Sequence, residues 1–149
     1  MIDARELRIG NLVFNDLGQL CVIAVVNDID SFVQVRNRET KNVEEYTFEQ
    51  IQPIELSEEW LIKFGFENSG KVPYKFILID KETSLEIVDP STIDPNKESI
   101  WWVVLFQHDR SGRELNLEDI DSVSLKSLKH VHQLQNLCFA HTGQELTMK

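Results

Sequence analysis

Residues 7–48 read LRIGNLVFNDLGQLCVIAVVNDIDSFVQVRNRETKNVEEYTF, and this stretch decides the fold of the first third of the chain. Four runs rich in Val, Ile, Phe and Tyr, separated by turn-forming residues, cover 7–14, 19–26, 31–37 and 42–48. Short apolar runs at such regular spacing are typical of a small all-β barrel or meander. The pattern therefore predicts an SH3-like β barrel over residues 1–56.

A second, α+β domain is predicted over residues 57–149. Ser57 is a suitable N-cap for a short helix that ends at Gly65. Strands at 74–80 and 84–88 form a hairpin, and a strand at 99–107 is expected to pair with 113–120. A long C-terminal helix completes this domain, so the predicted fold class is α+β. We expect the two domains to pack together as one unit.

The strand SIWWVVLFQ at 99–107 is apolar on both faces. Side chains alternate between the two faces of a strand, so Trp101 and Trp102 point in opposite directions. Two apolar faces both need cover. The C-terminal helix can cover one of them, and the barrel, the short helix or a second subunit the other. The strand therefore predicts close packing of the domains or a homodimer.

The run KSLKHVHQLQNLCFAHTG at 126–143 predicts the C-terminal helix and carries three of the four histidines. Ser122 or Ser124 can cap its start, and Gly143 can end it. At about 100° per residue, Gln135 falls inside the apolar arc of the helix and His132 at its edge. A buried Gln must find hydrogen bonds. It finds them either on the backbone of a neighbouring sheet or in a pocket or interface.

No complete metal or cofactor motif is visible. His130 and His132 would lie about 200° apart on a helix, and His130 and His141 about 16 Å apart along it. The six glycines form neither a dinucleotide fingerprint nor a P-loop. We therefore expect no metal ion and no cofactor.

No nucleophile motif is visible either. Cys138 and His141 share helical i, i+3 spacing, but Cys138 falls on the apolar arc, where a thiol keeps its proton. Cys21 also lies in an apolar run, LCVIAVV. Both cysteines are predicted to be buried free thiols, and no residue is assigned a catalytic role.

The composition limits the partners. The chain has 149 residues and a formal net charge of −10, with most of the acidic excess in the first two thirds. Phosphate-binding surfaces need clustered Lys and Arg, so this balance argues against a nucleic-acid partner. Arg36, Arg38 and Lys41 form a small basic tip that is too small to argue nucleic-acid binding on its own. No apolar run approaches the roughly 18 residues of a membrane span, so a cytoplasmic protein is expected.

Three segments together resemble a known group of sequences. They are ELRIGNLV at 6–13, IQPIELSEEWLIKFGF at 51–66 and HVHQLQNLCFAHTGQELT at 130–147. The group consists of small uncharacterised proteins encoded by Bacteroidetes genomes, their phages and mobile elements, with a pattern like VHQLQNLYFALTGEEL. This chain departs from that pattern at Cys138, His141 and Gln144. The resemblance implies an intracellular protein of phage or mobile-element context and supplies no activity.

The leading hypothesis is a non-enzymatic interaction or ligand-binding protein, an accessory factor of a phage or mobile element. Its partner would be a protein or a small polar ligand. The predicted contact surface consists of His132, Gln133, Gln135 and Asn136, with Trp101 or Trp102.

Two alternatives remain open. One is an enzyme acting on a nucleotide or small polar ligand through His108 and the carboxylates Glu118, Asp119 and Asp121. The other is a nucleic-acid-associated barrel protein. A pocket that holds two or more acid–base groups would favour the first, and a salt-dependent shift with DNA or RNA the second.

Overall fold

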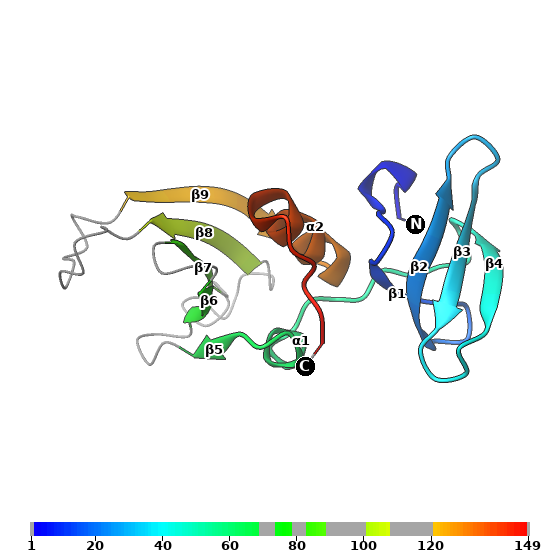
Figure 1. Cartoon of the computed structure of the whole chain (residues 1–149), viewed down its shortest axis with the longest axis horizontal. Helices are drawn as coiled ribbons and strands as arrows, with labels where there is room; N and C mark the ends of the chain where they lie inside the picture. Colours follow the sequence, from blue (N-terminus) through cyan, green and yellow to red (C-terminus); the bar gives the residue numbers. More distant parts are fainter. Residues whose placement is uncertain (1, 69–73, 79–82, 89–100, 108–120, 149) are drawn as a thin grey trace, which may run out of the picture. The chain divides into compact units, whose positions relative to one another are not determined.

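The computed structural model describes residues 2–68, 74–78, 83–88, 101–107 and 121–148. The chain divides into two compact units (Figure 1). The first unit consists of Met1–Glu55 and His130–Leu146, and the second of Leu56–Lys129 and Thr147–Lys149. The division after Glu55 lies one residue from the predicted domain boundary. The first unit is discontinuous, however, because it also contains the C-terminal helix.

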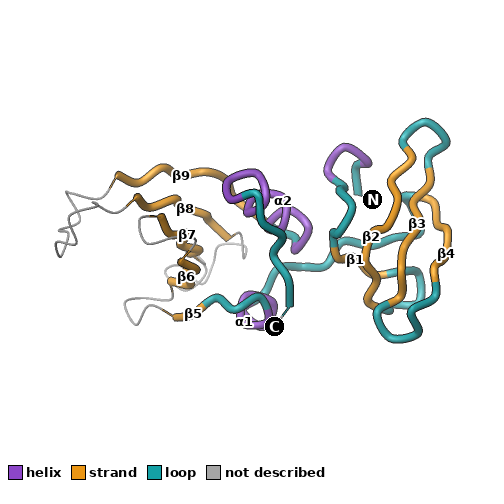
Figure 2. The backbone as a smooth tube through the Cα atoms, viewed as in Figure 1, coloured by secondary structure: helices purple, strands orange, loops and turns teal. Residues whose placement is uncertain are grey.

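The first unit begins with the short 3-10 helix η1 (Ala4–Glu6) and continues as an antiparallel sheet (Figure 2). Its strands follow one another in the order β1-β2-β3-β4. They are β1 (Leu12–Phe14), β2 (Leu20–Asn27), β3 (Phe32–Asn37) and β4 (Val43–Thr47). The four strands predicted from the apolar runs are therefore confirmed, with boundaries shifted by a few residues.

The predicted closure into an SH3-like barrel is not observed, since the four strands form an open sheet. Beyond β4 the chain returns to β1 at a single bridge between Phe14 and Gln52. Phe14 N–H donates to the carbonyl of Gln52 at 2.9 Å, and Gln52 N–H donates back at 2.8 Å. Because β1 has only three residues, it offers little edge for a closing strand to pair with.

The core of the first unit lies on one face of this sheet. Cys21 and Ile23 of β2 and Val33 and Val35 of β3 are at most 1% exposed. These positions alternate along their strands, as expected for a sheet with one buried face. Other members of the cluster come from outside these two strands: Ile2, Leu7, Val13 and Ile51.

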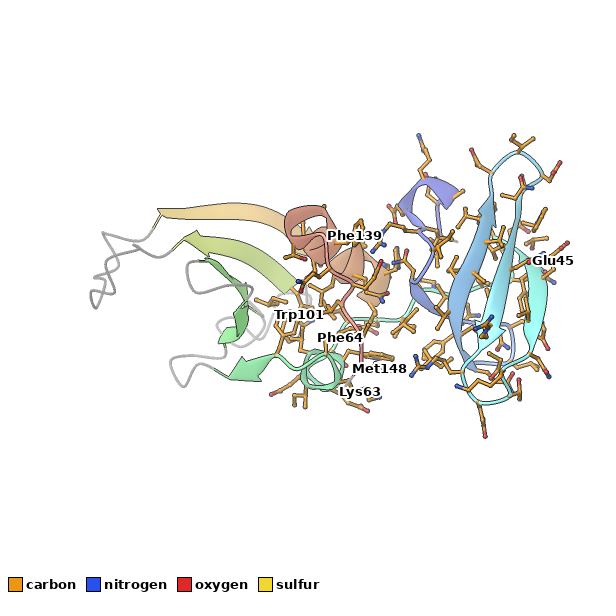
Figure 3. All side chains as sticks on the ribbon, viewed as in Figure 1. Glu45, Lys63, Phe64, Trp101, Phe139 and Met148 are labelled. Carbon is orange, nitrogen blue, oxygen red and sulfur yellow. The ribbon has the colours of Figure 1, made fainter. Side chains whose placement is uncertain are left out.

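The second unit contains the helix α1 (Glu58–Lys63) and a five-stranded antiparallel sheet in the order β5-β6-β7-β8-β9. Its strands are β5 (Glu67–Asn68), β6 (Tyr74–Leu78), β7 (Thr83–Val88), β8 (Trp101–Gln107) and β9 (Asp121–Leu128). Pairing of β6 with β7 confirms the predicted hairpin. Ser57 is the N-cap of α1, as predicted. Phe64 and Trp101 of this unit are labelled in Figure 3.

The predicted start of the C-terminal helix is wrong. Residues 121–128, which include both proposed caps, form strand β9 and pair with β8. Their sequence DSVSLKSL places Val123 and Leu125 two residues apart, which is strand periodicity. The predicted partner of β8 at 113–120 lies outside the described residues. Helix α2 spans Val131–Thr142 and ends at Gly143 with φ of 71°, which confirms the predicted end.

Helix α2 is grouped with the first unit, whereas the sequence placed it in the second domain; its packing on the second sheet stays a prediction. Val131 N–H, at the start of α2, donates to the carbonyl of Ile54 at 2.8 Å. The helix also contacts β1 through a polar side chain: Gln135 accepts a hydrogen bond from the backbone of Leu12. Apolar side chains could not supply such a bond. The side chains of residues 102–107 lie outside the described residues. Cover of both β8 faces, and the homodimer, therefore stay predictions.

No helix in the described part of the chain combines the length and apolar character needed to cross a bilayer.

Candidate functional site

Gln135 is buried inside the first unit, where its side chain holds three backbone groups. Its Oε1 accepts from Leu12 N–H of β1 at 2.8 Å. Its Nε2 donates to the carbonyls of Gly10 at 3.2 Å and Leu146 at 3.5 Å. The side chain is 2% exposed. Of the two explanations left open by the sequence, backbone bonding is the observed one: to strand β1 at Leu12, and to the non-strand residues Gly10 and Leu146.

His132 is buried as well, at 1% exposure. Its Nε2 lies 3.2 Å from the carboxylate of Glu6, while its Nδ1 has no hydrogen-bond partner among the described residues. The rings of His130 and His132 stack at 5.6 Å between centroids. They meet because His130 is the extended N-cap residue of α2 and not part of the helix. The predicted angle of about 200° between them therefore does not apply.

Asn136 also binds the segment that precedes β1. Its Nδ2 donates to the backbone carbonyl of Glu6, and its Oδ1 accepts from Asn11 Nδ2 at 2.8 Å. Asn11 is completely buried, and its own Oδ1 accepts from Arg8 N–H at 2.7 Å. The polar residues of α2 thus bind the segment that leads into β1.

The predicted contact surface is accordingly divided. Gln133 Oε1 accepts from His130 N–H at the start of α2, at 3.1 Å. Trp101 belongs to the second unit, is 5% exposed and donates through Nε1 to the carbonyl of Leu56 at 3.0 Å. The side chain of Trp102 lies outside the described residues. The structure therefore shows a structural use for each described member of the set.

Burial lowers the pKa of His132, and the neighbouring His130 acts in the same direction, while Glu6 opposes them. A folded-state pKa below the ordinary value of about 6.5 means that the unfolded chain binds the proton more readily. Stability should therefore fall as the pH drops below about 6.5. We expect urea unfolding midpoints to fall between about pH 7.5 and 5.5, and to fall less in His132→Phe. An identical pH dependence of both proteins would contradict this role of His132.

The two thiols are buried and free, as predicted. Burial raises the pKa of Cys138 to about 12 and raises that of Cys21. Since the thiolate is the nucleophile, neither sulfur is prepared for covalent chemistry. The side chain of His141 lies outside the described residues.

The acid–base groups of the enzymatic alternative are not described by the structure. His108, Glu118 and Asp119 lie outside the described residues, as does the side chain of Asp121 at the start of β9. Across the ranges that are described, no three His, Cys, Asp or Glu side chains are grouped to hold a metal ion.

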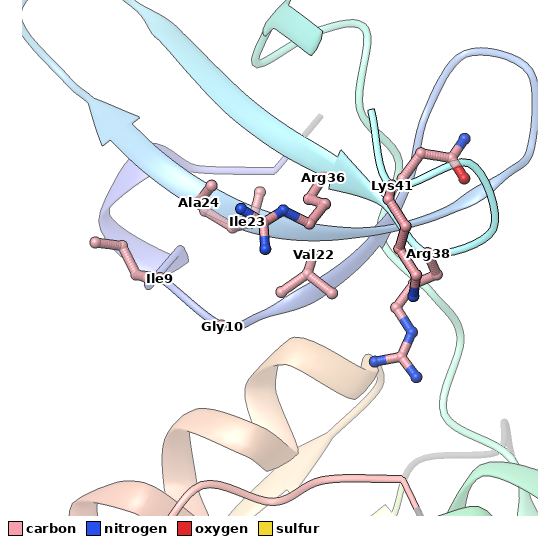
Figure 4. Close-up of a pocket in the computed structure, with 9 residues that line it drawn as sticks. Ile9, Gly10, Val22, Ile23, Ala24, Arg36, Arg38 and Lys41 are labelled. Atoms are coloured by element: carbon pink, nitrogen blue, oxygen red, sulfur yellow. The ribbon is translucent and has the colours of Figure 1, made fainter. Parts of the chain in front are cut away.

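A pocket of about 640 Å³ opens on the first unit (Figure 4). Its volume falls in the range of about 300–1,000 Å³ that is usual for small-molecule sites. It lies on the sheet face that carries Val22 and Arg36, a directly paired couple on β2 and β3. The lining residues are Ile9, Gly10, Val22, Ile23, Ala24, Arg36, Asn37, Arg38 and Lys41.

Asn37 organises the turn that supplies two of the pocket's cations. Its Oδ1 accepts from the backbone N–H groups of Glu39 at 2.9 Å and Thr40 at 3.1 Å. Its carbonyl accepts from Lys41 N–H at 3.0 Å. Lys41 adopts a left-handed conformation with φ of 64°, which few non-glycine residues adopt. This fixed turn places Arg38 and Lys41 beside the end of β3.

Among the described residues, no counter-charge pairs with the three cations of the pocket. No hydrogen bond or ion pair joins the charged groups of Arg36, Arg38 or Lys41 to any residue in the described ranges. By contrast, Arg5 and Lys63, elsewhere in the chain, pair with Asp3 and Glu59. In a chain of net charge −10, these three cations give the mouth of the pocket a locally positive charge.

The pocket has a cationic end and an apolar end along β2. Arg38 N–H donates to the carbonyl of Leu20 at 3.0 Å, and Arg36 pairs with Val22. Gly10 N–H donates to the carbonyl of Ile23 at 2.8 Å. Figure 4 shows the same order, with Arg38 and Lys41 at one end and Ile9 at the other. A ligand with one charged and one apolar part would match this order.

The basic tip was visible in the sequence, but the pocket was not. Arg36 and Arg38 are two residues apart on an extended segment, so they share a sheet face. That spacing could have indicated a charged face. No sequence signal places Ile9 and Gly10 beside β2, because they reach it through a loop that α2 holds from the other end of the chain.

Comparison with known proteins adds nothing to this geometry: no family model, curated protein or solved structure matches the chain.

Proposed function

We propose that the first unit is a non-enzymatic binding module that holds a small anionic ligand in the cationic pocket. The observation that carries the proposal is a set of three cations without partners in the described part of the chain, Arg36, Arg38 and Lys41, around a cavity of about 640 Å³. Guanidinium groups suit this purpose, because they bind carboxylate and phosphate oxygens with two parallel hydrogen bonds.

Binding is favoured over catalysis by the chemistry of the lining. Acid–base catalysis uses His, carboxylate, thiol or similar groups near the reacting atoms. The residues that line the described pocket are apolar or cationic apart from Asn37, whose side-chain oxygen is already occupied by the turn. An enzyme acting on a nucleotide or small polar ligand remains the alternative, through the groups of the second unit.

The resemblance to phage and mobile-element proteins supplies the proposed context, a cytoplasmic accessory factor. We also propose that the open sheet is a relative of the SH3-like barrel. Four antiparallel strands in sequence order, followed by a return to β1 at Gln52, support that relation. The acidic net charge favours a small ligand over nucleic acid.

The test is a calorimetric titration of the full chain with inorganic phosphate, adenosine monophosphate, benzoate and a short single-stranded DNA. We expect a small anion to bind, and Arg36→Gln/Arg38→Gln to weaken its binding by at least about 100-fold, since each charge-assisted hydrogen bond contributes about 1.5–3 kcal/mol. Arg5→Gln/Lys63→Gln is the matched control, because it removes the same charge outside the pocket. Equal loss in both variants, or no binding by any small anion, would overturn the proposal.

A further inference from the structure

We infer that the ligand is a nucleotide-like phosphate ester, with its phosphate at Arg38 and Lys41 and a flat apolar body over Val22, Ala24 and Ile9. This inference rests on the proposed function and names the chemical class and orientation of the ligand. Three features carry it: the number of cations, the separation of the two ends, and the position of Arg36 between them.

The number of cations favours phosphate over carboxylate. Arg36, Arg38 and Lys41 together present three positive charges with no partner in the described part of the chain. A carboxylate supplies one negative charge, whereas a phosphate monoester carries about −1.5 to −2 at pH 7 and three strong acceptor oxygens. Phosphate therefore neutralises more of the site and can accept from several donors at once.

The separation of the two ends favours an ester over free phosphate. The register places Arg38 beside Leu20 and Gly10 beside Ile23, with Ala24 beyond. The four residue-to-residue steps of strand from Leu20 to Ala24 span about 13 Å. Free phosphate would occupy only the cationic end. A ligand that also covers Val22, Ala24 and Ile9 removes apolar surface from water, and Ile9 is 62% exposed in the free protein.

The position of Arg36 favours a flat body. Arg36 is paired with Val22 in the middle of the pocket, and Figure 4 shows its side chain between the two ends. A planar guanidinium stacks on aromatic faces while its edge donates to anionic oxygens. A base stacked on Arg36, with its phosphate directed to Arg38, would use both the face and the edge of the Arg36 guanidinium. An aliphatic body could not stack on that face.

The first test is calorimetry on the full chain with adenosine monophosphate, inorganic phosphate, adenosine and benzoate. We expect adenosine monophosphate to bind at least about tenfold more tightly than phosphate or adenosine, because only it fills both ends. Ile9→Ser should weaken the binding of adenosine monophosphate and leave the affinity for inorganic phosphate unchanged. Ile29→Ser is the matched control, since Ile29 is 95% exposed and lies outside the pocket.

The second measurement is amide NMR, which reports the orientation. Phosphate should shift the amides of Arg38 and Lys41, and the nucleotide should also shift those of Gly10 and Ala24. Equal affinity for phosphate and nucleotide, or an unchanged nucleotide affinity in Ile9→Ser, would overturn the inference. Benzoate binding that depends on Arg38, without nucleotide binding, would also overturn it while leaving the proposed function intact. DNA binding without binding of any small anion would overturn both.

Discussion

Replacing Gln135 with leucine is expected to lower the free energy of unfolding by about 2–4 kcal/mol. The substitution nearly preserves side-chain size but leaves Leu12 N–H without its acceptor, and the carbonyls of Gly10 and Leu146 without their donor. A buried backbone group that loses its partner costs about 1–3 kcal/mol. Chemical denaturation followed by tryptophan fluorescence and circular dichroism would measure the loss.

The matched control is Gln144→Leu, which makes the same chemical change at an exposed residue just beyond α2. We expect this variant to stay within about 0.5 kcal/mol of the natural protein. If both variants unfolded at the same denaturant concentration, the hydrogen bonds of Gln135 would not hold α2 in place.

The same substitution should also weaken ligand binding at the pocket. Gly10 lines the pocket, and its carbonyl is held by Gln135. Its φ of 96° is one that side-chain-bearing residues rarely adopt, so this backbone needs support. In the proposed binding site, Gln135 would therefore act as a positioning residue that supports the backbone of Gly10 from helix α2.

The second large effect concerns the whole helix. A chain that ends at Lys129 should lose the fold of the first unit, although all four strands of its sheet remain. Val131 and Leu134 are fully buried and Cys138 is 4% exposed. Each buried apolar side chain of this size contributes about 1.5–3 kcal/mol, so their loss approaches the total stability of about 5–15 kcal/mol that small proteins have.

Hydrogen exchange would measure this loss one amide at a time. The amides of Cys21, Ile23 and Val35 should exchange at rates close to those of an unfolded chain after truncation. Adding a synthetic peptide of residues 130–149 should restore part of their protection. Retained protection in the truncated chain would contradict this prediction. It would show that the four-stranded sheet folds and is stable without α2.

Much of the fold was predictable because its signals are local. The apolar runs of 7–48 and their turns predict β1 to β4, and the residues around Ser57 and Gly65 predict α1. The start of α2 was not predictable in the same way. Residues 121–128 contain helix-compatible Leu, Lys and Ser, and pairing with the strongly apolar β8 decided their conformation. Tertiary context commonly overrides propensity in this manner.

The candidate site was predictable only in part. Arg36, Arg38 and Lys41 stand out as a basic group in an acidic chain, but charge alone does not make a cavity. The residues expected to form a surface, His132 and Gln135, are buried in the contact between α2 and the β1 segment. Sequence shows that a buried Gln must be satisfied, and it does not show which backbone satisfies it.

By itself, the sequence determined the strand periodicity, the helix stops at Gly65 and Gly143, the buried thiols and the need to satisfy Gln135. Each of these follows from neighbours along the chain. Only the tertiary structure decided that α2 belongs to the first unit, that the sheet stays open and that three cations share one pocket. The first depends on contacts between residues more than a hundred positions apart, such as Gln135 and Gly10. The other two depend on how segments between Ile9 and Gln52 pair across the sheet. Local propensity and periodicity carry no information about such distant pairs.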